Sequence, residues 1–216
     1  MAKAGRGQII VTRQSDQSAT ATTDTAAKPG PDSLIAAAKQ AQKEGKLPPV
    51  DQWDPPFCGD LDMEIKRDGT WFYEGTPIGR KPLVRLFSTI LKREGDAYFL
   101  VTPVEKVGIR VEDAPFVAVD FEAAGEGPAQ VITFKTNVGD TVIAGRENAI
   151  RVVRDANGEP SPYVHVRAGL EALIDRKSFY RLVDLGEAHE VEGEDWFGVW
   201  STGEFFKIIP VAELDL

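Results

Sequence analysis

Two stretches of this chain carry basic side chains at matching positions of a repeated motif. Residues 77–87 read PIGRKPLVRLF and residues 173–183 read LIDRKSFYRLV. The matching pairs are Ile78 and Ile174, Arg80 and Arg176, Lys81 and Lys177, Arg85 and Arg181, and Leu86 and Leu182. Each stretch is predicted to begin a helix, where unpaired backbone N–H groups and the positive dipole end favour an anion. Neighbouring cations would complete a phosphate or carboxylate site. The alternative is that these are solvated charges inherited with the duplication.

A second candidate lies in the run YVHVR, residues 163–167. If it is a strand, Tyr163, His165 and Arg167 share one face, because successive side chains alternate between the two faces. An aromatic ring, a titratable imidazole and a guanidinium in a row suit a flat polar ligand. The alternative is that the histidine is a structural residue whose hydrogen bonds are satisfied within the fold.

Two further sets of charged residues also alternate along predicted strands. Lys106 and Arg110 lie four residues apart, so both could point at one anion, unless they simply lie at a solvent-facing edge. Asp60, Asp62 and Glu64 alternate in the same way and could hold a divalent cation, or be the wet side of a strand.

Hydrophobic spacing predicts the elements that must position these residues. Leu61, Met63 and Ile65 alternate with acidic residues, which indicates a half-buried strand, and the RDGT turn at 67–70 returns it through residues 71–73. Apolar residues at 3.6-residue spacing predict a helix from Pro82 to Leu91. Further strands are predicted at 98–101, 107–111, 116–121, 130–136, 141–144, 150–153 and 163–166, then a helix at 176–185 and a hairpin of 196–200 with 205–209.

These elements predict an α+β fold built from a duplicated unit, with two mainly antiparallel sheets that each carry one or two helices. Residues 1–31, rich in Ala, Thr, Ser and Gln, are expected to be a disordered N-terminal extension. A short helix is expected at 32–46, followed by a first repeat domain at 47–125 and a second at 126–216.

Composition limits the classes of partner. The net charge is −9, and after residue 50 the chain has 18 basic and 30 acidic side chains. Such a body repels a nucleic-acid backbone, so a nucleic-acid polymer is not expected as a partner. One cysteine (Cys58) excludes a disulfide within the chain and a multi-thiol zinc site, and two histidines make a histidine-rich metal site unexpected. No general base stands near Cys58 in sequence, and no metal ligand is assigned. Neither a membrane span nor a secretory signal is expected, which leaves the cytoplasm as the expected location.

Several strings in the chain resemble one uncharacterised proteobacterial family, domain of unknown function 1285. They are PPFCGDLDM (55–63), DGTWFY (68–73), GTPIGRKP (75–82), LVTPVEKV (100–107), DAPF (113–116) and YVHVRAGL (163–170). The resemblance covers roughly residues 47–209. It implies a duplicated α+β core with a second half similar to a pleckstrin-homology fold, a nucleotide-like ligand at the seam between the halves, and a signalling role.

The first functional hypothesis is therefore a cytoplasmic binding or sensor protein that holds a nucleotide-like or other phosphorylated molecule between the repeats. Aromatic rings would stack on a planar group and cations would neutralise phosphate. The residues expected to line the cleft are Trp71, Tyr73, Arg80, Lys106, Arg110, Tyr163, His165 and Arg167. The alternatives are a protein–protein interaction module or a metal-dependent hydrolase that uses Asp60 and Asp62 with a third ligand such as Asp120 or His165. No catalytic residue and no cofactor is assigned.

Overall fold

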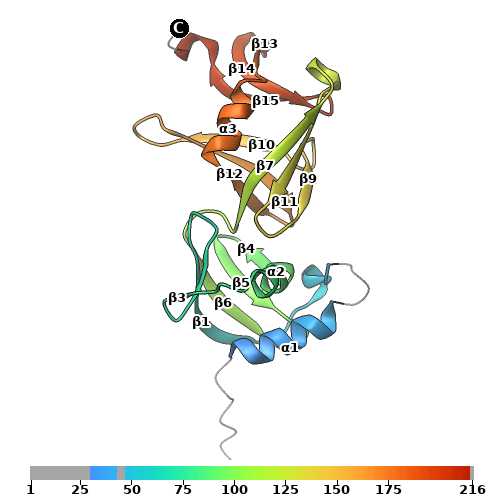
Figure 1. Cartoon of the computed structure of the whole chain (residues 1–216), viewed down its shortest axis with the longest axis vertical. Helices are drawn as coiled ribbons and strands as arrows, with labels where there is room; N and C mark the ends of the chain where they lie inside the picture. The colour runs from blue at the N-terminus through green and yellow to red at the C-terminus, as the bar shows by residue number, and fades with distance from the viewer. Residues whose placement is uncertain (1–29, 43–46, 215–216) are drawn as a thin grey trace, which may run out of the picture.

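The computed structural model describes residues 30–42 and 47–214, and these form two units that follow one another along the long axis of the molecule (Figure 1). The first unit contains one six-stranded sheet and two helices, and the second contains a six-stranded sheet, a helix and a three-stranded sheet. Of the N-terminal extension predicted at residues 1–31, residues 1–29 lie outside the described part of the chain. Among the described residues, no helix has the length and apolar character needed to cross a membrane.

The first sheet grows from the predicted alternating strand, because Leu61, Met63 and Ile65 point inward and are buried. Its strands in spatial order are β3 (Thr76–Pro77), β2 (Trp71–Tyr73), β1 (Phe57–Ile65), β6 (Lys106–Val111), β5 (Ala97–Val101) and β4 (Leu91–Glu94). All neighbours are antiparallel except β1 and β6, which run parallel. Helix α2 (Lys81–Thr89) buries Leu86 and Phe87 against this sheet, and α1 (Pro31–Ala41) packs beside α2. The short η1 (Val50–Gln52) leads from α1 into β1.

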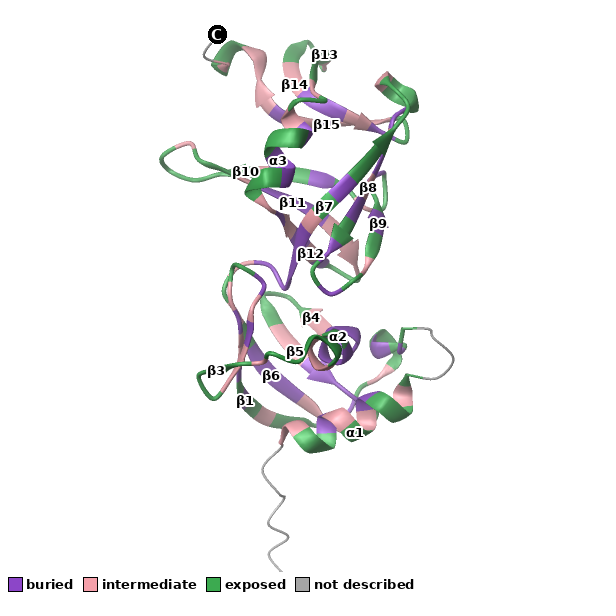
Figure 2. Ribbon diagram, in the orientation of Figure 1, coloured by how far each residue is buried: buried purple, intermediate pink, exposed green. Residues whose placement is uncertain are grey.

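The second sheet repeats this pattern of one parallel pair among antiparallel ones. Its strands in spatial order are β10 (Ile150–Arg154), β11 (Pro160–Arg167), β12 (Leu170–Ile174), β7 (Phe116–Ala124), β8 (Val131–Thr136) and β9 (Thr141–Ile143). The parallel pair is β12 with β7. Strand β7 is long and the sheet curls around its buried face (Figure 2). The turn η2 (Gly127–Ala129) joins β7 to β8.

The chain closes with a helix and a three-stranded meander. Helix α3 (Arg176–Val183) is followed by β13 (Glu187–Val191), β14 (Glu194–Ser201), β15 (Glu204–Pro210) and the turn η3 (Val211–Glu213). The first unit has the same succession, since α2 is followed by the meander β4, β5 and β6. The pairing of the two meanders differs: β6 pairs with β1 and joins the main sheet, whereas β13–β15 form a sheet of their own.

The units are joined by specific contacts and by one continuous cluster of buried side chains that draws on both. The β1–β2 turn of the first unit reaches the second, where Arg67 Nη2 donates to Ser161 Oγ at 2.8 Å and Asn137 Nδ2 donates to the Gly69 oxygen at 3.2 Å. A Cβ atom on Gly69, whose φ is +81°, would lie 2.5 Å from Asn137 Nδ2, so a larger residue does not fit this approach.

The predicted α+β class with two mainly antiparallel sheets and duplicated units is confirmed. The helix predicted from Pro82 to Leu91 ends earlier than expected, at Thr89, because Leu91 pairs with Leu100 and starts β4. The short helix expected at 32–46 is α1, described at Pro31–Ala41. Strand β7 falls inside the predicted first domain, 47–125, yet both of its partner strands, β12 and β8, belong to the second sheet, which places the change of unit just before it.

Candidate functional site

The two copies of the repeated motif form α2 and α3, but the N-termini of these two helices are capped differently. In α3, Asp175 is the N-cap residue and its carboxylate accepts from the Ser178 N–H at 2.7 Å. In the register of the motif, Gly79 and Pro82 stand where Asp175 and Ser178 stand. The first turn of α2 therefore has neither an acidic cap nor that N–H, and its N-cap residue Arg80 makes no side-chain cap bond. The start of α2 keeps its positive end uncompensated.

The same contrast applies to the arginine that the copies share. On α3, the Arg181 guanidinium pairs with the Asp120 carboxylate, donates to the Phe121 oxygen at 3.0 Å and lies over the Phe121 ring at 4.6 Å. The guanidinium in turn lowers the pKa of Asp120 through its hydrogen bond. On α2, Arg85 is exposed and has no carboxylate within ion-pair distance in the described part of the chain. One copy has a neutralised arginine and the other a free one.

Arg85 lines a hollow of about 830 Å³ at the seam between the two units. The first unit contributes Gly69, Thr70, Trp71, Ile78, Gly79, Lys81, Pro82, Val84 and Arg85, and the second contributes Val119, Thr136, Asn137, Val138 and Gly139. We refer to this hollow as the seam cleft. Its lining includes the two cations and not one carboxylate, although the whole chain has a net charge of −9. The charged side chains of this lining therefore have the opposite sign to the net charge of the chain.

The two cations of the seam cleft lie on one helix, and one of them comes close to the second unit. Lys81 and Arg85 are four residues apart on α2, so their side chains leave the helix on one face. Opposite them, Gly139 sits in the β8–β9 turn with φ +88°, and a Cβ atom there would lie 3.3 Å from Arg85 Nη1. Glycine at this turn lets the guanidinium come close to the second unit.

The aromatic wall of the seam cleft is Trp71. Its ring is 1% exposed and stacks on Phe87 with centroids 6.2 Å apart and planes at 15°. Its indole N–H is buried and has no hydrogen-bond partner among the described residues. An unpaired buried donor costs about 1–3 kcal/mol, which an acceptor that reached this N–H would recover.

Asn137 defines the other wall. Its Oδ1 accepts from the Val117 N–H at 3.0 Å within the second unit, while its Nδ2 donates to Gly69 of the first. Both ends of the amide are thereby used to join the units. Asn137 therefore links the two units at the edge of the seam cleft.

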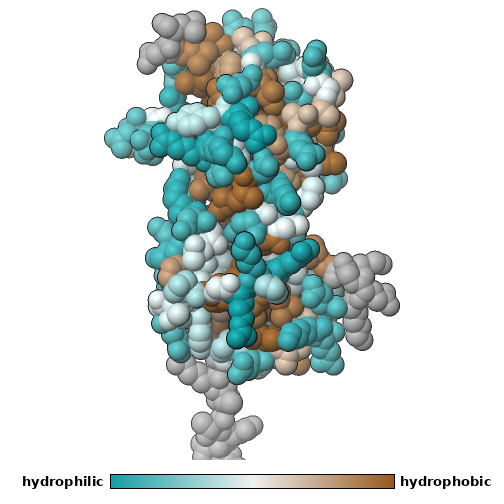
Figure 3. All heavy atoms as spheres, viewed as in Figure 1, coloured by the Kyte–Doolittle hydropathy of each residue, from teal (hydrophilic) through white to brown (hydrophobic). Residues whose placement is uncertain are grey.

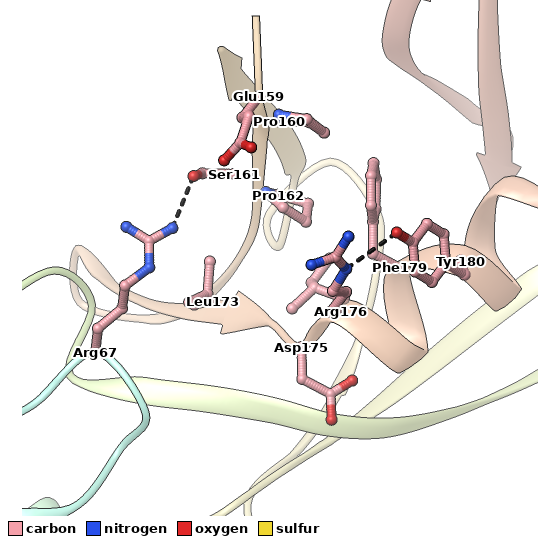
Figure 4. Close-up of a pocket in the computed structure, with 11 residues that line it drawn as sticks. Arg67, Glu159, Pro160, Ser161, Pro162, Leu173, Asp175, Arg176, Phe179 and Tyr180 are labelled. Atoms are coloured by element: carbon pink, nitrogen blue, oxygen red, sulfur yellow. Dashed lines mark hydrogen bonds between the residues drawn. The ribbon is translucent and has the colours of Figure 1, made fainter. Parts of the chain in front are cut away.

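A second hollow of about 410 Å³ lies at the start of α3 (Figure 4). Figure 4 shows Arg67 of the first unit reaching Ser161, and Arg176 turned onto the Tyr180 hydroxyl, to which its Nε donates at 3.0 Å. Arg67 is also paired with Asp113 at 3.0 Å. This hollow carries Glu159 and Asp175 beside its two arginines, so its charges are balanced where those of the seam cleft are not.

Comparison with known proteins agrees with this two-unit organisation. The family models described as "Domain of unknown function (DUF1285), N-terminal domain" and "Protein of unknown function (DUF1285), C-terminal domain" match residues 48–114 and 115–208. The chain belongs to the DUF1285 family. The resemblance found in the sequence is thus confirmed, and the change from one DUF1285 domain to the next falls just before β7.

Two solved DUF1285 structures are similar to this chain. A crystal structure of a DUF1285 family protein from Silicibacter pomeroyi DSS-3 is 64% identical, covers 85% of this chain and 98% of its own, and superposes with a TM-score of 0.76. One from Shewanella baltica OS155 is 31% identical, covers 57% of this chain and 91% of its own, and gives a TM-score of 0.46. No curated protein matches this chain.

Of the eight residues predicted to line a cleft, the structure places Trp71 in the seam cleft and Arg80 beside it at the start of α2. Tyr73 lies on β2 and packs against the core, and its pKa is raised chiefly by burial. The prediction that all eight share one cleft is therefore not met by this DUF1285 protein. The other five each have partners inside the fold.

Lys106 and Arg110 do not converge on one point as their spacing suggested. Lys106 Nζ binds Glu94 at 3.0 Å and lies 5.0 Å from the Phe99 ring centroid. Arg110 binds Asp62 at 2.8 Å on the neighbouring strand, and this hydrogen bond raises the pKa of the guanidinium. Each cation is occupied by its own cross-strand carboxylate.

The predicted row Tyr163, His165 and Arg167 is interrupted by a register shift between His165 and Arg167. The Tyr163 hydroxyl donates to Asp113 at 2.7 Å, and burial raises the pKa of this phenol. Both ring nitrogens of His165 are used: Nδ1 is 2.8 Å from the Glu147 oxygen and Nε2 accepts from the Gly169 N–H at 3.1 Å. This geometry fits the interpretation of His165 as a structural residue whose hydrogen bonds are satisfied within the fold.

The sequence indicated Lys81 as a cation of an anion site at a helix start, whereas Arg85, Asn137 and Gly139 belonged to no predicted site. Lys81 and Arg85 were visible in the motif, and their i, i+4 spacing on a predicted helix was the signal that they share a face. Asn137 and Gly139 belong to a turn whose contact with Gly69, 68 residues away, has no local signal in the sequence.

Proposed function

We propose that this DUF1285 protein binds a small anionic molecule, of the nucleotide-like or other phosphorylated kind, in the seam cleft and acts as a binding or sensor protein. The observation that carries the proposal is the charge of the lining, in which Lys81 and Arg85 stand without any carboxylate. A phosphate placed between these two side chains would gain a charge-assisted contact with each of them. In the described part of the chain, no carboxylate pairs with either cation and competes for these contacts.

The shape of the seam cleft supports a ligand with a flat part as well as a charge. About 830 Å³ lies within the range of small-molecule sites. The unpaired N–H of Trp71 suits an acceptor atom, and the apolar side chains of Ile78, Val84 and Val138 suit a ring. Figure 3 shows hydrophobic residues reaching the surface near the level where the two units meet, bordered by hydrophilic ones.

Binding at the seam supports a sensing role, because a ligand there contacts both units. The lining comes from α2 and β2 on one side and from β7 and the β8–β9 turn on the other. A molecule that bridges them stabilises one arrangement of the units over others, which is how a binding event is passed to a partner. We also propose the cytoplasm as the compartment, where an exposed thiol such as that of Cys58 stays reduced.

The hydrolase alternative requires a third ligand beside Asp60 and Asp62. Within residues 30–42 and 47–214, no three His, Cys, Asp or Glu side chains gather closely enough to hold a metal ion. Asp62 is already paired with Arg110. The geometry therefore favours binding over metal-assisted hydrolysis.

The test is a thermal-shift titration of the full chain with ADP, and with adenosine and inorganic phosphate as the two halves of that probe. Ligand at about 100 times its Kd adds about 2.7 kcal/mol of stability, a readily measured rise in Tm. We expect ADP to raise the Tm more than either half, and Arg85→Gln to abolish the rise while Arg110→Gln keeps it. A rise that survives Arg85→Gln, or no rise with any phosphorylated probe, would reject the seam cleft as an anion site.

A further inference from the structure

The three-stranded sheet at the C-terminal end has one buried face and one partly exposed face that carries aromatic and acidic side chains. Val199, Phe206 and Ile208 are buried on the inner side. Pairing of Trp200 with Phe205, and of His189 with Trp196, places the alternate residues on the outer side. We call this outer surface the aromatic face, and its members are Glu187, His189, Glu194, Trp196, Trp200 and Phe205.

The rings of the aromatic face are held in a fixed cluster. The centroids of His189, Trp200 and Phe205 are 4.8, 5.0 and 5.2 Å apart. Phe205 reaches over Gly198, where a Cβ atom would lie 2.7 Å from its ring. Trp196, Trp200 and Phe205 are nonetheless only partly buried, so each of these residues keeps some contact with solvent.

The hydrogen bonds of this surface leave it with acceptors and no free indole donors. Trp200 Nε1 donates to Glu187 at 2.8 Å, and Trp196 Nε1 donates to Glu194 at 2.9 Å. Each carboxylate uses one oxygen in this way and keeps its second oxygen available. What the aromatic face offers a partner is therefore π-electrons and carboxylate oxygens, both of which attract cations.

The local charge points in the same direction. Residues 182–206 contain seven acidic side chains and no lysine or arginine. In the described part of the chain, only Glu192 and Glu204 of these seven lie within 4.0 Å of a cationic side chain, namely Lys207 and Arg146. The other carboxylates are left without a cation.

The chain itself shows how a cation sits on this surface. Lys207 Nζ lies 4.9 Å from the Trp196 ring centroid, next to Glu192. Trp200 and Phe205 present the same combination of ring and carboxylate with no cation above them in the described structure. The ring of Trp196 thus already has a cation from this chain, whereas the rings of Trp200 and Phe205 have none in the described structure.

We propose that the aromatic face binds an arginine- or lysine-rich segment of a protein partner. The guanidinium or ammonium groups stack on Trp200 and Phe205 and donate to the free oxygens of Glu187 and Glu194. Charge complementarity selects this occupant, because nucleic acid and anionic lipid are repelled by the same carboxylates. This surface belongs to β13–β15 and is separate from the seam cleft, so either proposal stands if the other fails.

The test uses the full chain and a fluorescein-labelled peptide of five Gly-Arg repeats, followed by fluorescence anisotropy at low salt. The first variant is the double substitution Glu187→Gln and Glu194→Gln. It removes both charges, but the amide oxygens can still accept hydrogen bonds from the two indole N–H groups. The matched control is Glu190→Gln with Asp195→Asn, a cross-strand pair on the opposite side of the same sheet with the same change in net charge. Far-UV circular dichroism checks that all variants are folded.

We expect the first double variant to weaken binding about tenfold and the control at most about twofold, because direct contacts outweigh screened charges. Trp200→Leu weakens binding about fivefold, whereas the exposed Phe57→Leu leaves it unchanged. Equal losses in the two double variants, or no binding of the peptide by the wild type up to about 1 mM, would overturn the proposal. So would a wild-type dimer in sedimentation that Trp200→Leu dissociates, since a second copy would then be the occupant.

Discussion

The guanidinium of Arg167 on β11 donates from Nη2 to the Ser88 carbonyl oxygen near the end of α2 at 2.9 Å, across the boundary between the units. The same guanidinium pairs with Asp140 in the β8–β9 turn and lies 4.9 Å from the Phe116 ring centroid. A helix C-terminus carries partial negative charge, so the Arg167 side chain satisfies both a carboxylate and the end of α2. One residue thereby fixes α2, which carries Lys81 and Arg85, against the second unit.

Replacing Arg167 by methionine is expected to lower the free energy of unfolding by about 2 kcal/mol, since a partly buried carboxylate and a helix end both lose their partner. Urea denaturation measures this difference. The control is Arg110→Met, which removes an ion pair whose members are 62% and 57% exposed and is expected to cost clearly less, because solvent screens exposed pairs. Similar losses in the two variants would show that Arg167 is not a link between the units.

The contact of Gly69 with Asn137 predicts a second large effect. Gly69→Ala combines a positive φ with a Cβ atom 2.5 Å from Asn137 Nδ2, and we expect a loss of about 3 kcal/mol. Gly75→Ala is the matched control, because its φ is +72° and nothing lies within 4 Å of the added atom. It should cost only the backbone strain of about 1 kcal/mol. Equal losses would mean that the β1–β2 turn does not press on the second unit.

Periodicity was sufficient to predict those parts of this fold in which burial is local. Leu61, Met63 and Ile65 are buried at every second position, and Leu86 and Phe87 lie on the inner face of α2, as their spacing indicated. The duplication was also predictable from the repeated motif at 77–87 and 173–183. In the structure both copies of the motif form a helix that is followed by a meander. Side-chain alternation and helical spacing are short-range rules, so a single sequence reveals them.

The composition of the candidate site could not be predicted in the same way, because it depends on which charges become neutralised. Arg85 and Arg181 are equivalent in sequence, and only the position of Asp120, 61 residues before Arg181, separates their roles. The register shift after His165 likewise moves Arg167 out of the row that strict alternation predicts and directs it to Ser88. Both outcomes are set by long-range pairing of strands and units, for which the local sequence carries no signal.

That contrast between the two arginines is itself testable through stability. Arg181→Met removes the contacts with Asp120, the Phe121 oxygen and the Phe121 ring, and we expect a loss of about 1 kcal/mol. Arg85→Met is expected to change stability by at most about 0.5 kcal/mol, because the exposed side chain has no partner to lose. Thermal unfolding of both variants, without added ligand, measures the pair. A larger loss for Arg85→Met would mean that its charge serves the fold and not a ligand.

The pairing of Arg151 with Glu171 predicts part of the acid sensitivity. Arg151 Nε and Nη2 each donate to a Glu171 oxygen at 2.6 Å, and this interaction lowers the pKa of Glu171 below its usual value of about 4.5. A carboxyl with a lowered folded-state pKa stabilises the protein fully above its unfolded-state pKa, and this stabilisation is lost as the pH falls through the folded-state value. Glu171→Gln should therefore cost about 1 kcal/mol at pH 7, and its difference from the wild type should shrink between pH 5 and pH 3. Urea denaturation across that range measures the difference. A difference for Glu171→Gln that stays constant down to pH 3 would mean that the carboxylate charge contributes nothing to the pair.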